Sequence, residues 1–237
     1  MLSPAGRVVL ISGANRGIGL GVATQLYGAG YSLSLGARNV AALFAVVEAW
    51  SPERVMTHVY DAKDASTHQD WIDATVARFG RIDGLVNNAG IALNVDLESG
   101  DDEGLDELWG VNVKAPLSMT RKALPHLRKC GSGRVINVAS MAGKVVFGSG
   151  IGYSMSKFSL VALSHATRHA GWDDGVRCTA LCPGYVSTDM TVGLQTITQE
   201  KMIAPSDIAE LVATVMGLSN NASVAELIVN CRPDPSM

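Results

Sequence analysis

The sequence predicts a doubly wound α/β fold, in which a single parallel sheet carries helices on both faces. Three observations predict it. Short apolar runs alternate along the chain with longer segments of helical period, which is the order of repeated strand–helix–strand units. Several of the short runs are apolar on both alternating faces, as in strands that helices cover on both sides. Because crossovers between parallel strands are right-handed, these units leave the doubly wound sheet as the leading topology.

The predicted strands are the short apolar runs, each bounded by a turn or by a helical segment. Arg7-Val8-Val9-Leu10-Ile11, for example, ends at a glycine turn. In chain order, the strands are expected at residues 7–11, 31–35, 55–59, 84–87, 134–138, 176–181 and 225–229.

The predicted helices fill the intervals between these strands. The first five are expected at residues 18–27, 40–50, 67–79, 102–127 and 151–169. Pro116 lies inside the long helix and predicts a kink there, because proline lacks the N–H that a helix interior needs. Ser206-Asp207 is expected to cap a last helix that runs to Met216.

No linker, repeat or low-complexity tract divides the chain, so we expect one domain over residues 1–237. The acidic stretch over 96–107 fits a solvated loop and helix start. The segment over about 186–205 has few structural cues and is expected to form a substrate loop or lid.

Composition excludes several classes of protein. The 237 residues are 47% hydrophobic and 17% charged, which excludes an intrinsically disordered chain. A net charge of −3 and 5% aromatic residues lack the basic, stacking-rich pattern of nucleic-acid binders. No secretory signal is visible, and no apolar run approaches the roughly 20 residues that a membrane span needs. With only four scattered cysteines, we expect a cytoplasmic protein with reduced thiols and neither a nucleic-acid nor a membrane partner.

A glycine turn directly follows the first predicted strand and opens the first helix. It reads Ser12-Gly13-Ala14-Asn15-Arg16-Gly17-Ile18-Gly19. Glycine lets the backbone turn sharply and approach a pyrophosphate, while N–H groups at the helix start point toward the anion. The spacing differs from G-x-G-x-x-G, and its position between strand and helix is what favours dinucleotide binding over a merely structural turn.

Two arginines favour NADP over NAD as the cofactor. Arg38 follows the second strand, where a carboxylate would bind the ribose 2′-OH of NAD and an arginine suits the 2′-phosphate of NADP. Arg16 in the glycine turn is a second cation. The alternative is that both are ordinary surface arginines.

Tyr153 and Lys157 are four residues apart, which places them on one face of a helix. A tyrosine pKa is ordinarily about 10, and a nearby ammonium lowers it by favouring the phenolate. Ser140 lies at the end of the strand over 134–138, where ligands of open α/β sheets bind. Tyr-x-x-x-Lys also occurs by chance as a surface pair, so the prediction of a catalytic site depends on Ser140 and the other motifs as well.

Taken together, these motifs resemble the short-chain dehydrogenase/reductase family over essentially the whole chain. The residues that carry the resemblance are Gly13-x-x-x-Gly17-x-Gly19, Asn87-Asn88-Ala89-Gly90, Asn112, Ser140, Tyr153-x-x-x-Lys157 and Pro183-Gly184. Their order and spacing agree with the family throughout. The resemblance implies a Rossmann-type NAD(P)-binding domain with the catalytic site built in, and a homodimer or homotetramer.

The resemblance also implies roles for individual residues. Tyr153 becomes the general acid–base and Ser140 the hydrogen-bond donor to the substrate oxygen. Lys157 favours the tyrosinate and binds the nicotinamide ribose, and Asn112 anchors a water in a proton relay. The implied cofactor-binding residues are Gly13, Asn15, Arg16, Gly17, Ile18, Gly19, Arg38, Asp61, Asn88, Ala89, Gly90, Tyr153, Lys157, Pro183, Gly184, Val186 and Thr188.

The substrate is less well indicated. The candidate pocket residues are mostly apolar and include one cation that could bind a carboxylate: Leu93, Lys144, Val145, Phe147, Ile151, Tyr185, Met190 and Leu194. The final strand, Ala225–Asn230, lacks the glycine-rich ending of many ketoacyl-carrier reductases, and somewhat resembles serine or 3-hydroxy-acid dehydrogenases. Basic residues over 121–129 fit an exposed helix end better than a docking patch for an acidic carrier.

We therefore expect an NADP-dependent oxidoreductase that interconverts a small-molecule carbonyl and an alcohol by hydride transfer. The alternatives are a non-catalytic NADP-binding regulator on the same fold or, among enzymes, a 3-oxoacyl-carrier reductase or 3-hydroxy-acid dehydrogenase. No metal is expected, because His165 and His169 have no third ligand nearby in the sequence.

Overall fold

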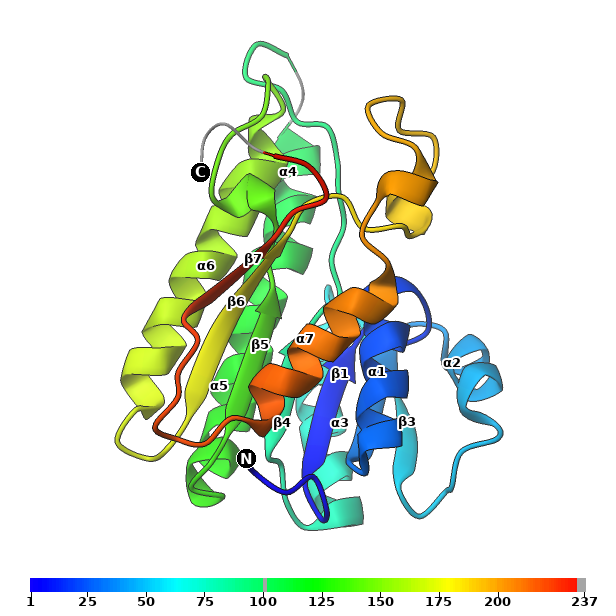
Figure 1. Cartoon of the computed structure of the whole chain (residues 1–237), viewed down its shortest axis with the longest axis vertical. Helices are drawn as coiled ribbons and strands as arrows, with labels where there is room; N and C mark the ends of the chain where they lie inside the picture. Colours follow the sequence, from blue (N-terminus) through cyan, green and yellow to red (C-terminus); the bar gives the residue numbers. More distant parts are fainter. Residues whose placement is uncertain (100–101, 234–237) are drawn as a thin grey trace.

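The structure is a computed structural model that describes residues 1–99 and 102–233. Its centre is a seven-stranded sheet in the order β3-β2-β1-β4-β5-β6-β7, in which every neighbouring pair is parallel. Helices cover both faces of the sheet (Figure 1). This arrangement confirms the predicted doubly wound α/β fold.

The strands lie close to the predicted apolar runs. They are β1 (Val8–Ser12), β2 (Ser32–Ala37), β3 (Val55–Val59), β4 (Gly84–Asn87), β5 (Arg134–Val138), β6 (Arg177–Pro183) and β7 (Glu226–Val229). The α-helices are α1 (Gly17–Ala29), α2 (Val40–Val47), α3 (Ala65–Phe79), α4 (Asp102–Trp109), α5 (Ala115–Lys129), α6 (Ile151–Gly171) and α7 (Pro205–Gly217).

The alternating side chains of β1 supply both halves of the core. Val9 and Ile11 pack with buried apolar residues of α1 and α7 on one face, and Figure 1 shows these two helices side by side. Leu10 packs with buried residues of α3 and α5 on the other face. Both faces of the central strand are therefore covered, which explains why its sequence is apolar without alternation.

The long helix predicted over 102–127 is confirmed as a continuous helical run from Asp102 to Lys129 that contains one irregular turn. Between α4 and α5 the chain makes a π-helical turn, η1 (Gly110–Lys114), in which the Ala115 N–H donates to the Gly110 carbonyl. The expected kink residue, Pro116, is the second residue of α5 and follows this turn directly; proline lacks the N–H that a regular helical turn would use. The helix thus departs from regular α-helical geometry just before the proline and does not end there.

The last helix begins earlier than predicted. α7 starts at Pro205, and Ala204 is its N-cap residue. Proline suits the first helical position because its φ is preset and its missing N–H would have no intrahelical partner. The Asp207 carboxylate accepts a hydrogen bond from the Ala204 N–H at 3.3 Å, so this residue supports the helix start from inside the first turn.

The reversal of strand order at β1 and β4 opens a crevice at the carboxyl ends of the strands. That edge of the sheet is where the site described below lies. Within the described residues, no helix is both long and apolar enough to cross a membrane.

Candidate active site

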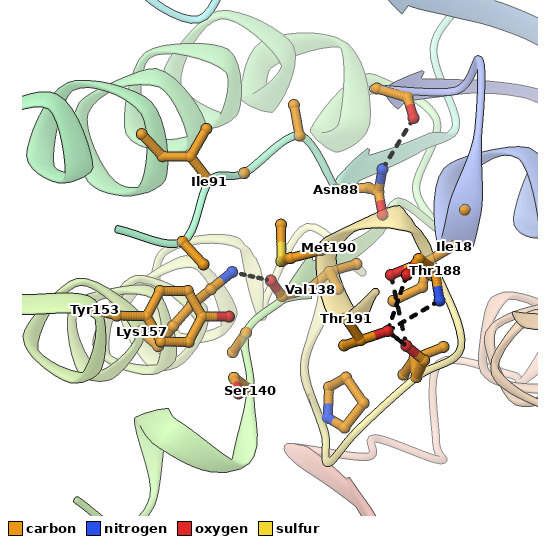
Figure 2. A pocket seen from close by; sticks show the side chains of 18 of the residues that line it. Ile18, Asn88, Ile91, Val138, Ser140, Tyr153, Lys157, Thr188, Met190 and Thr191 are labelled. Carbon is orange, nitrogen blue, oxygen red and sulfur yellow. Dashed lines mark hydrogen bonds between the residues drawn. The ribbon is translucent and has the colours of Figure 1, made fainter. Parts of the chain in front are cut away.

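A cavity of about 770 Å³ lies at the carboxyl edge of the sheet. All seven strands contribute to it through their last residues or the turns that follow. One lining residue from each, in the order β1 to β7, is Gly13, Ala37, Tyr60, Asn88, Ala139, Gly184 and Asn230. Parallel pairing thus gathers side chains that are far apart in the sequence around one space (Figure 2).

Every predicted catalytic and cofactor-binding residue lines this cavity except Gly19 and Asn112. Gly19 lies behind the glycine turn. A side chain there would overlap the Gly13 carbonyl and the Asn88 amide, so Gly19 is needed for close packing of α1 on the turn. Its predicted direct contact with cofactor does not follow from this position.

The glycine turn has the geometry of an anion cradle. Gly13 and Gly17 have φ of +65° and +54°, which L-residues with side chains rarely adopt. The Gly13 N–H donates to the Gly36 carbonyl at 2.7 Å. Among the described residues, no side chain caps the N-terminus of α1, so its first N–H groups are available to a phosphate.

The turn after β1 and the turn after β4 are held together by hydrogen bonds. The Ser12 hydroxyl accepts from the N–H groups of Asn88 and Ala89, both at 3.0 Å. In the other direction, the Asn88 amide donates to the carbonyls of Ser12 at 2.9 Å and Gly13 at 3.2 Å. The predicted cofactor turns therefore form one rigid wall.

The two arginines have different surroundings. Arg38 is exposed at the end of β2 and lines the cavity. Arg16 forms an ion pair with Asp189 at 2.9 Å, and both side chains are about two-thirds exposed, 68% and 69%. Arg16 thereby links the glycine turn to the segment after β6, and Arg38 is the cation that remains at the end of β2.

Tyr153 and Lys157 project from α6 on the same wall of the cavity as Ser140, which follows β5 (Figure 2). The Lys157 Nζ lies 5.6 Å from the centroid of the Tyr153 ring and donates to the Val138 carbonyl at 2.9 Å. The Ser140 hydroxyl accepts from the Ala142 N–H at 3.1 Å, which leaves its own proton available for a ligand.

Burial dominates the titration of this pair. It raises the pKa of Tyr153, and the neighbouring Ser140 hydroxyl offsets this only in part. Burial also lowers the pKa of Lys157 to about 8. Desolvation therefore sets the direction of the Tyr153 shift in this structure, and the lowering of its pKa by Lys157 stays a prediction.

Asn112 lies in the π-helical turn and is 1% exposed. Its Oδ1 accepts from the Ile91 N–H at 3.0 Å, and its Nδ2 donates to the Ile91 carbonyl at 2.9 Å and the Ser156 Oγ at 3.0 Å. The side chain thus ties the segment after β4 to α6. The implied water relay stays a prediction, and the observed contacts give Asn112 a positioning role.

Only some of the predicted substrate residues line the cavity. Five of them line the cavity: Leu93, Phe147, Tyr185, Met190 and Leu194. Val145, Ile151 and Lys144 are not among the lining residues. Lys144 is paired with Glu226 at 2.5 Å, and Glu226 also binds His165 at 2.8 Å. The suggested contact between Lys144 and a substrate carboxylate is therefore not supported.

The two ends of the segment after β6 are hydrogen-bonded to each other. The Ser187 N–H donates to the Ile203 carbonyl and the Ile203 N–H to the Tyr185 carbonyl, both at 2.9 Å. Two short 3-10 turns, Asp189–Thr191 and Gln199–Lys201, lie between these contacts. Thr188, Asp189, Met190, Thr191 and Leu194 line the cavity from this segment, so it borders the cavity with both polar and apolar side chains, and its role as a substrate loop stays a prediction.

Sequence reasoning missed several charged or polar residues of the cavity, among them Lys63, Glu107, Asp189, Asn230 and Arg232. Asp189 gave no signal, since its partner Arg16 is distant in the sequence. Asn230 and Arg232 reach the cavity because β7 pairs with β6 in a register that puts Val229 beside Pro183. The register between β6 and β7 cannot be read from the residues around Asn230 and Arg232 alone.

Nothing in the described part of the chain gathers three or more His, Cys, Asp or Glu side chains into a group that could hold a metal ion. His165 binds Glu226, as described above.

Comparison with known proteins gives the family. The model of a family described as short chain dehydrogenase matches residues 7–199. The chain is 44% identical over 227 residues to an agropine synthesis reductase of Rhizobium rhizogenes, an alignment that covers 94% of this chain and 52% of the relative. It thus spans about half the length of that curated relative.

Two solved structures share nearly the whole fold. An alcohol dehydrogenase of the archaeon Thermococcus sibiricus, complexed with 5-hydroxy-NADP, has a TM-score of 0.88 and 30% identity over 96% of this chain and 99% of the other. A 3-ketoacyl-(acyl-carrier-protein) reductase of Brucella melitensis, complexed with NADH, has a TM-score of 0.88 and 26% identity over 97% and 98%.

Gly143 tests how closely the Ser140 segment packs on α6. A Cβ at this position would lie 2.7 Å from the Lys157 carbonyl oxygen, which is backbone and cannot move alone. We expect Gly143→Ala to lower the free energy of unfolding by about 1–3 kcal/mol, the usual cost of overpacking. Gly28→Ala in α1, where nothing lies within 4 Å, should instead raise it by about 0.5–1 kcal/mol. Urea denaturation measures both, and equal stabilities of the two variants would contradict this packing.

Proposed function

This chain belongs to the short-chain dehydrogenase family of NAD(P)-dependent oxidoreductases that act on CH–OH groups, and we propose that it reduces a small-molecule carbonyl to an alcohol, or the reverse, with NADP. The observation that carries this proposal is the grouping of Ser140, Tyr153 and Lys157 on one wall of the cavity that the glycine turn also lines. Members of the family with the cofactor bound, such as the NADP and NADH complexes above, support it.

The cavity fits a dinucleotide. A volume of about 770 Å³ is within the range of about 300–1,000 Å³ that is usual for ligand sites. The positive-φ glycines and the uncapped start of α1 would hold the pyrophosphate. Asp61, Asn88, Ala89 and Gly90 would flank the adenosine, and Pro183, Gly184, Val186 and Thr188 the nicotinamide.

The protein residues would handle the proton and orient the substrate. When bound, the cofactor supplies or accepts the hydride. In reduction, Tyr153 donates its phenolic proton to the carbonyl oxygen, and Ser140 donates a hydrogen bond to the same oxygen as negative charge develops there. The ammonium of Lys157 stabilises the tyrosinate that remains. The raised pKa of Tyr153 keeps the proton on the phenol at neutral pH, as the proton donor of the reductive step requires.

Arg38 is the support for NADP over NAD. It is exposed at the end of β2 and lines the cavity, and no carboxylate follows β2 directly to bind a ribose 2′-OH. Arg16 would have to leave Asp189 to reach a phosphate. An exposed ion pair of this kind contributes only about 0–1 kcal/mol, so the loss would be small.

We also propose that the chain forms a homo-oligomer through a groove between η1–α5 and α6. The groove, of about 290 Å³, is lined by Val113, Leu117, Ser159, Leu160, Ala162, Leu163 and Ala166. Met155 and Phe158 are 41% and 42% exposed on the same helix. Small residues let a helix of a second copy approach closely, and burial of the apolar groove would drive association.

The four free thiols support the reducing cytoplasm as the proposed location of the protein.

The Tyr153–Lys157 pair generates a prediction about rate and pH. In the wild type, kcat/KM for carbonyl reduction should fall as pH rises through about 8, because the Lys157 ammonium, whose pKa burial lowers to about 8, is lost there. Tyr153→Phe should reduce the rate by at least about 100-fold at every pH, since it removes the proton donor. NADPH oxidation with a panel of ketones and aldehydes measures both. Wild-type turnover in Tyr153→Phe would refute the mechanism, and tight NADPH binding without any turnover in the wild type would favour a non-catalytic regulator.

Cofactor choice is tested at Arg38. Arg38→Asp should weaken NADPH binding by about tenfold or more and leave NADH binding nearly unchanged, because only NADPH carries the 2′-phosphate. Fluorescence titration with each cofactor gives the two dissociation constants. Lys114→Asp, on the π-helical turn and outside the cavity lining, is a control with the same change of charge. Equal losses for both cofactors would contradict the 2′-phosphate role.

The groove is tested by placing a charge in it. Ala162→Arg should dissociate the oligomer, because an exposed position would then present a guanidinium where a second copy must pack. Ala77→Arg, also exposed but on α3, should leave the assembly intact. Light scattering after size exclusion measures both masses. An unchanged mass for Ala162→Arg would place the subunit contact elsewhere.

A further inference from the structure

The cavity has a cation at the end opposite Arg38 that neither the sequence analysis nor the proposed chemistry uses. Arg232 lies three residues beyond the last ladder pair of β7 and lines the cavity. Its guanidinium carbon is 5.2 Å from the centroid of the Tyr185 ring, which also lines the cavity. An arginine over an aromatic face is held in place while its N–H groups stay free for another partner.

The sheet fixes where this cation lies. The Gly184 N–H donates to the Val229 carbonyl at 2.8 Å, and a side chain on Gly184 would lie 2.6 Å from the Asn230 Oδ1. The segment that carries Arg232 is therefore packed against the start of the segment that follows β6. β2, which carries Arg38, is five strands away from β7, about 24 Å at the usual spacing between strands. Arg232 is thus remote from the predicted 2′-phosphate site and close to the predicted nicotinamide segment.

Apart from Arg38 at the β2 end, the other cations of the cavity wall have partners. Arg16 is paired with Asp189 and Lys63 with Glu107, and Lys157 donates to a backbone carbonyl. Among the described residues, Arg232 has no carboxylate within ion-pair distance. The neighbouring cation that sequence analysis had considered, Lys144, is neutralised by Glu226.

The cavity that Arg232 lines also presents apolar side chains. Met190, Leu194 and Phe147 line the same cavity, and their exposed fractions are 52%, 43% and 46%. A guanidinium that has no carboxylate partner in the described part of the chain, in a cavity that also has apolar side chains, favours a substrate with an apolar part and one anionic group. The planar fork of guanidinium matches a carboxylate through two parallel hydrogen bonds.

We propose that Arg232, stacked on Tyr185, binds a carboxylate of the substrate, so that the enzyme acts on oxo acids and the corresponding hydroxy acids. This assignment rests on the proposed carbonyl reduction and names its substrate class. Arg232 is a specificity-determining residue that orients the substrate through its charged end, while Tyr153 and Ser140 engage the carbonyl oxygen.

The test compares an oxo acid with its ester. The probes are 4-oxopentanoate and methyl 4-oxopentanoate, which share a ketone and differ in the charge of one end. With NADPH, the wild type should prefer the acid. Arg232→Gln should lower kcat/KM for the acid by about tenfold or more, as expected for loss of a charge-assisted hydrogen bond, and leave the ester unchanged. Arg232→Lys should retain part of the preference. Arg78→Gln, which removes an exposed arginine of α3 outside the cavity lining, should behave as the wild type.

Two results would overturn the assignment. One is an acid-to-ester ratio that is the same in the wild type and in Arg232→Gln. The other is a loss of NADPH affinity in Arg232→Gln that is as large as the loss of kcat/KM, because the arginine would then serve the cofactor.

Binding separates this inference from the proposed function. Calorimetric titration of both probes into the protein with NADP⁺ needs no turnover. Tighter binding of the acid that Arg232→Gln abolishes would support the carboxylate site even if the enzyme reduced neither probe, in which case the proposed reaction alone would fail. Turnover of the ester without any preference for the acid, in rate or in binding, would leave the proposed reaction standing and overturn the role of Arg232.

Discussion

Parallel pairing of seven strands is the constraint on which the rest of the structure depends. It puts all seven carboxyl ends at one edge, so every element of the site can lie on a turn while the sheet carries the stability. Hydrogen bonds between neighbouring turns then fix their relative positions: Gly13 to Gly36 across β1 and β2, Asn88 to Ser12 across β4 and β1, and Gly184 to Val229 across β6 and β7. The backbone itself is the scaffold of the site, and glycine is required where one turn must touch the next.

The same close packing sets the electrostatics of the reactive wall. Gly90 leaves room for Asn112 and Lys157, whose nearest atoms would lie 3.2 and 3.6 Å from a Cβ there. With so little space, Lys157 is buried with the Val138 carbonyl as its hydrogen-bond partner, and burial shifts the pKa values of Lys157 and Tyr153 toward their neutral forms. On such a wall the phenol of Tyr153 keeps its proton, and a ligand charge placed nearby would have a large effect on the pKa values of Tyr153 and Lys157. Ligand binding, by bringing phosphate and ribose oxygens near the ammonium, would change that balance.

Local sequence was sufficient for the strands and for the glycine turn, because these depend on apolar runs and on positive-φ positions that only nearby residues control. The resemblance to a known family supplied the roles of Tyr153, Lys157 and Ser140, and those roles stay predictions that the geometry accommodates. What sequence could not supply are pairings across the chain. The Arg16–Asp189 pair spans 173 residues and the Lys144–Glu226 pair spans 82, and each changes what a cation seen in the sequence is free to do. The π-helical turn before Pro116 was missed for a related reason: proline predicts an irregularity in the helix, while the hydrogen bonds that Asn112 makes from this turn go to Ile91 and Ser156, which are distant in the sequence.

The distribution of charge in the cavity follows from these long-range pairings and gives the site two unlike ends. The net charge of −3 for the whole chain does not predict the distribution of charge in the cavity, because surface charges are screened within about 10 Å. At the β2 end, Arg38 is free and Arg16 is held by an exposed pair that costs little to separate. At the β7 end, Arg232 lies over the Tyr185 ring and, within residues 1–99 and 102–233, has no carboxylate at ion-pair distance. Between them lies the wall of Tyr153, Ser140 and Lys157, where the proposed carbonyl would react. A ligand set with anionic groups at both extremes and an uncharged reacting centre would match this pattern, because each charge would then be neutralised where the cavity presents its complement.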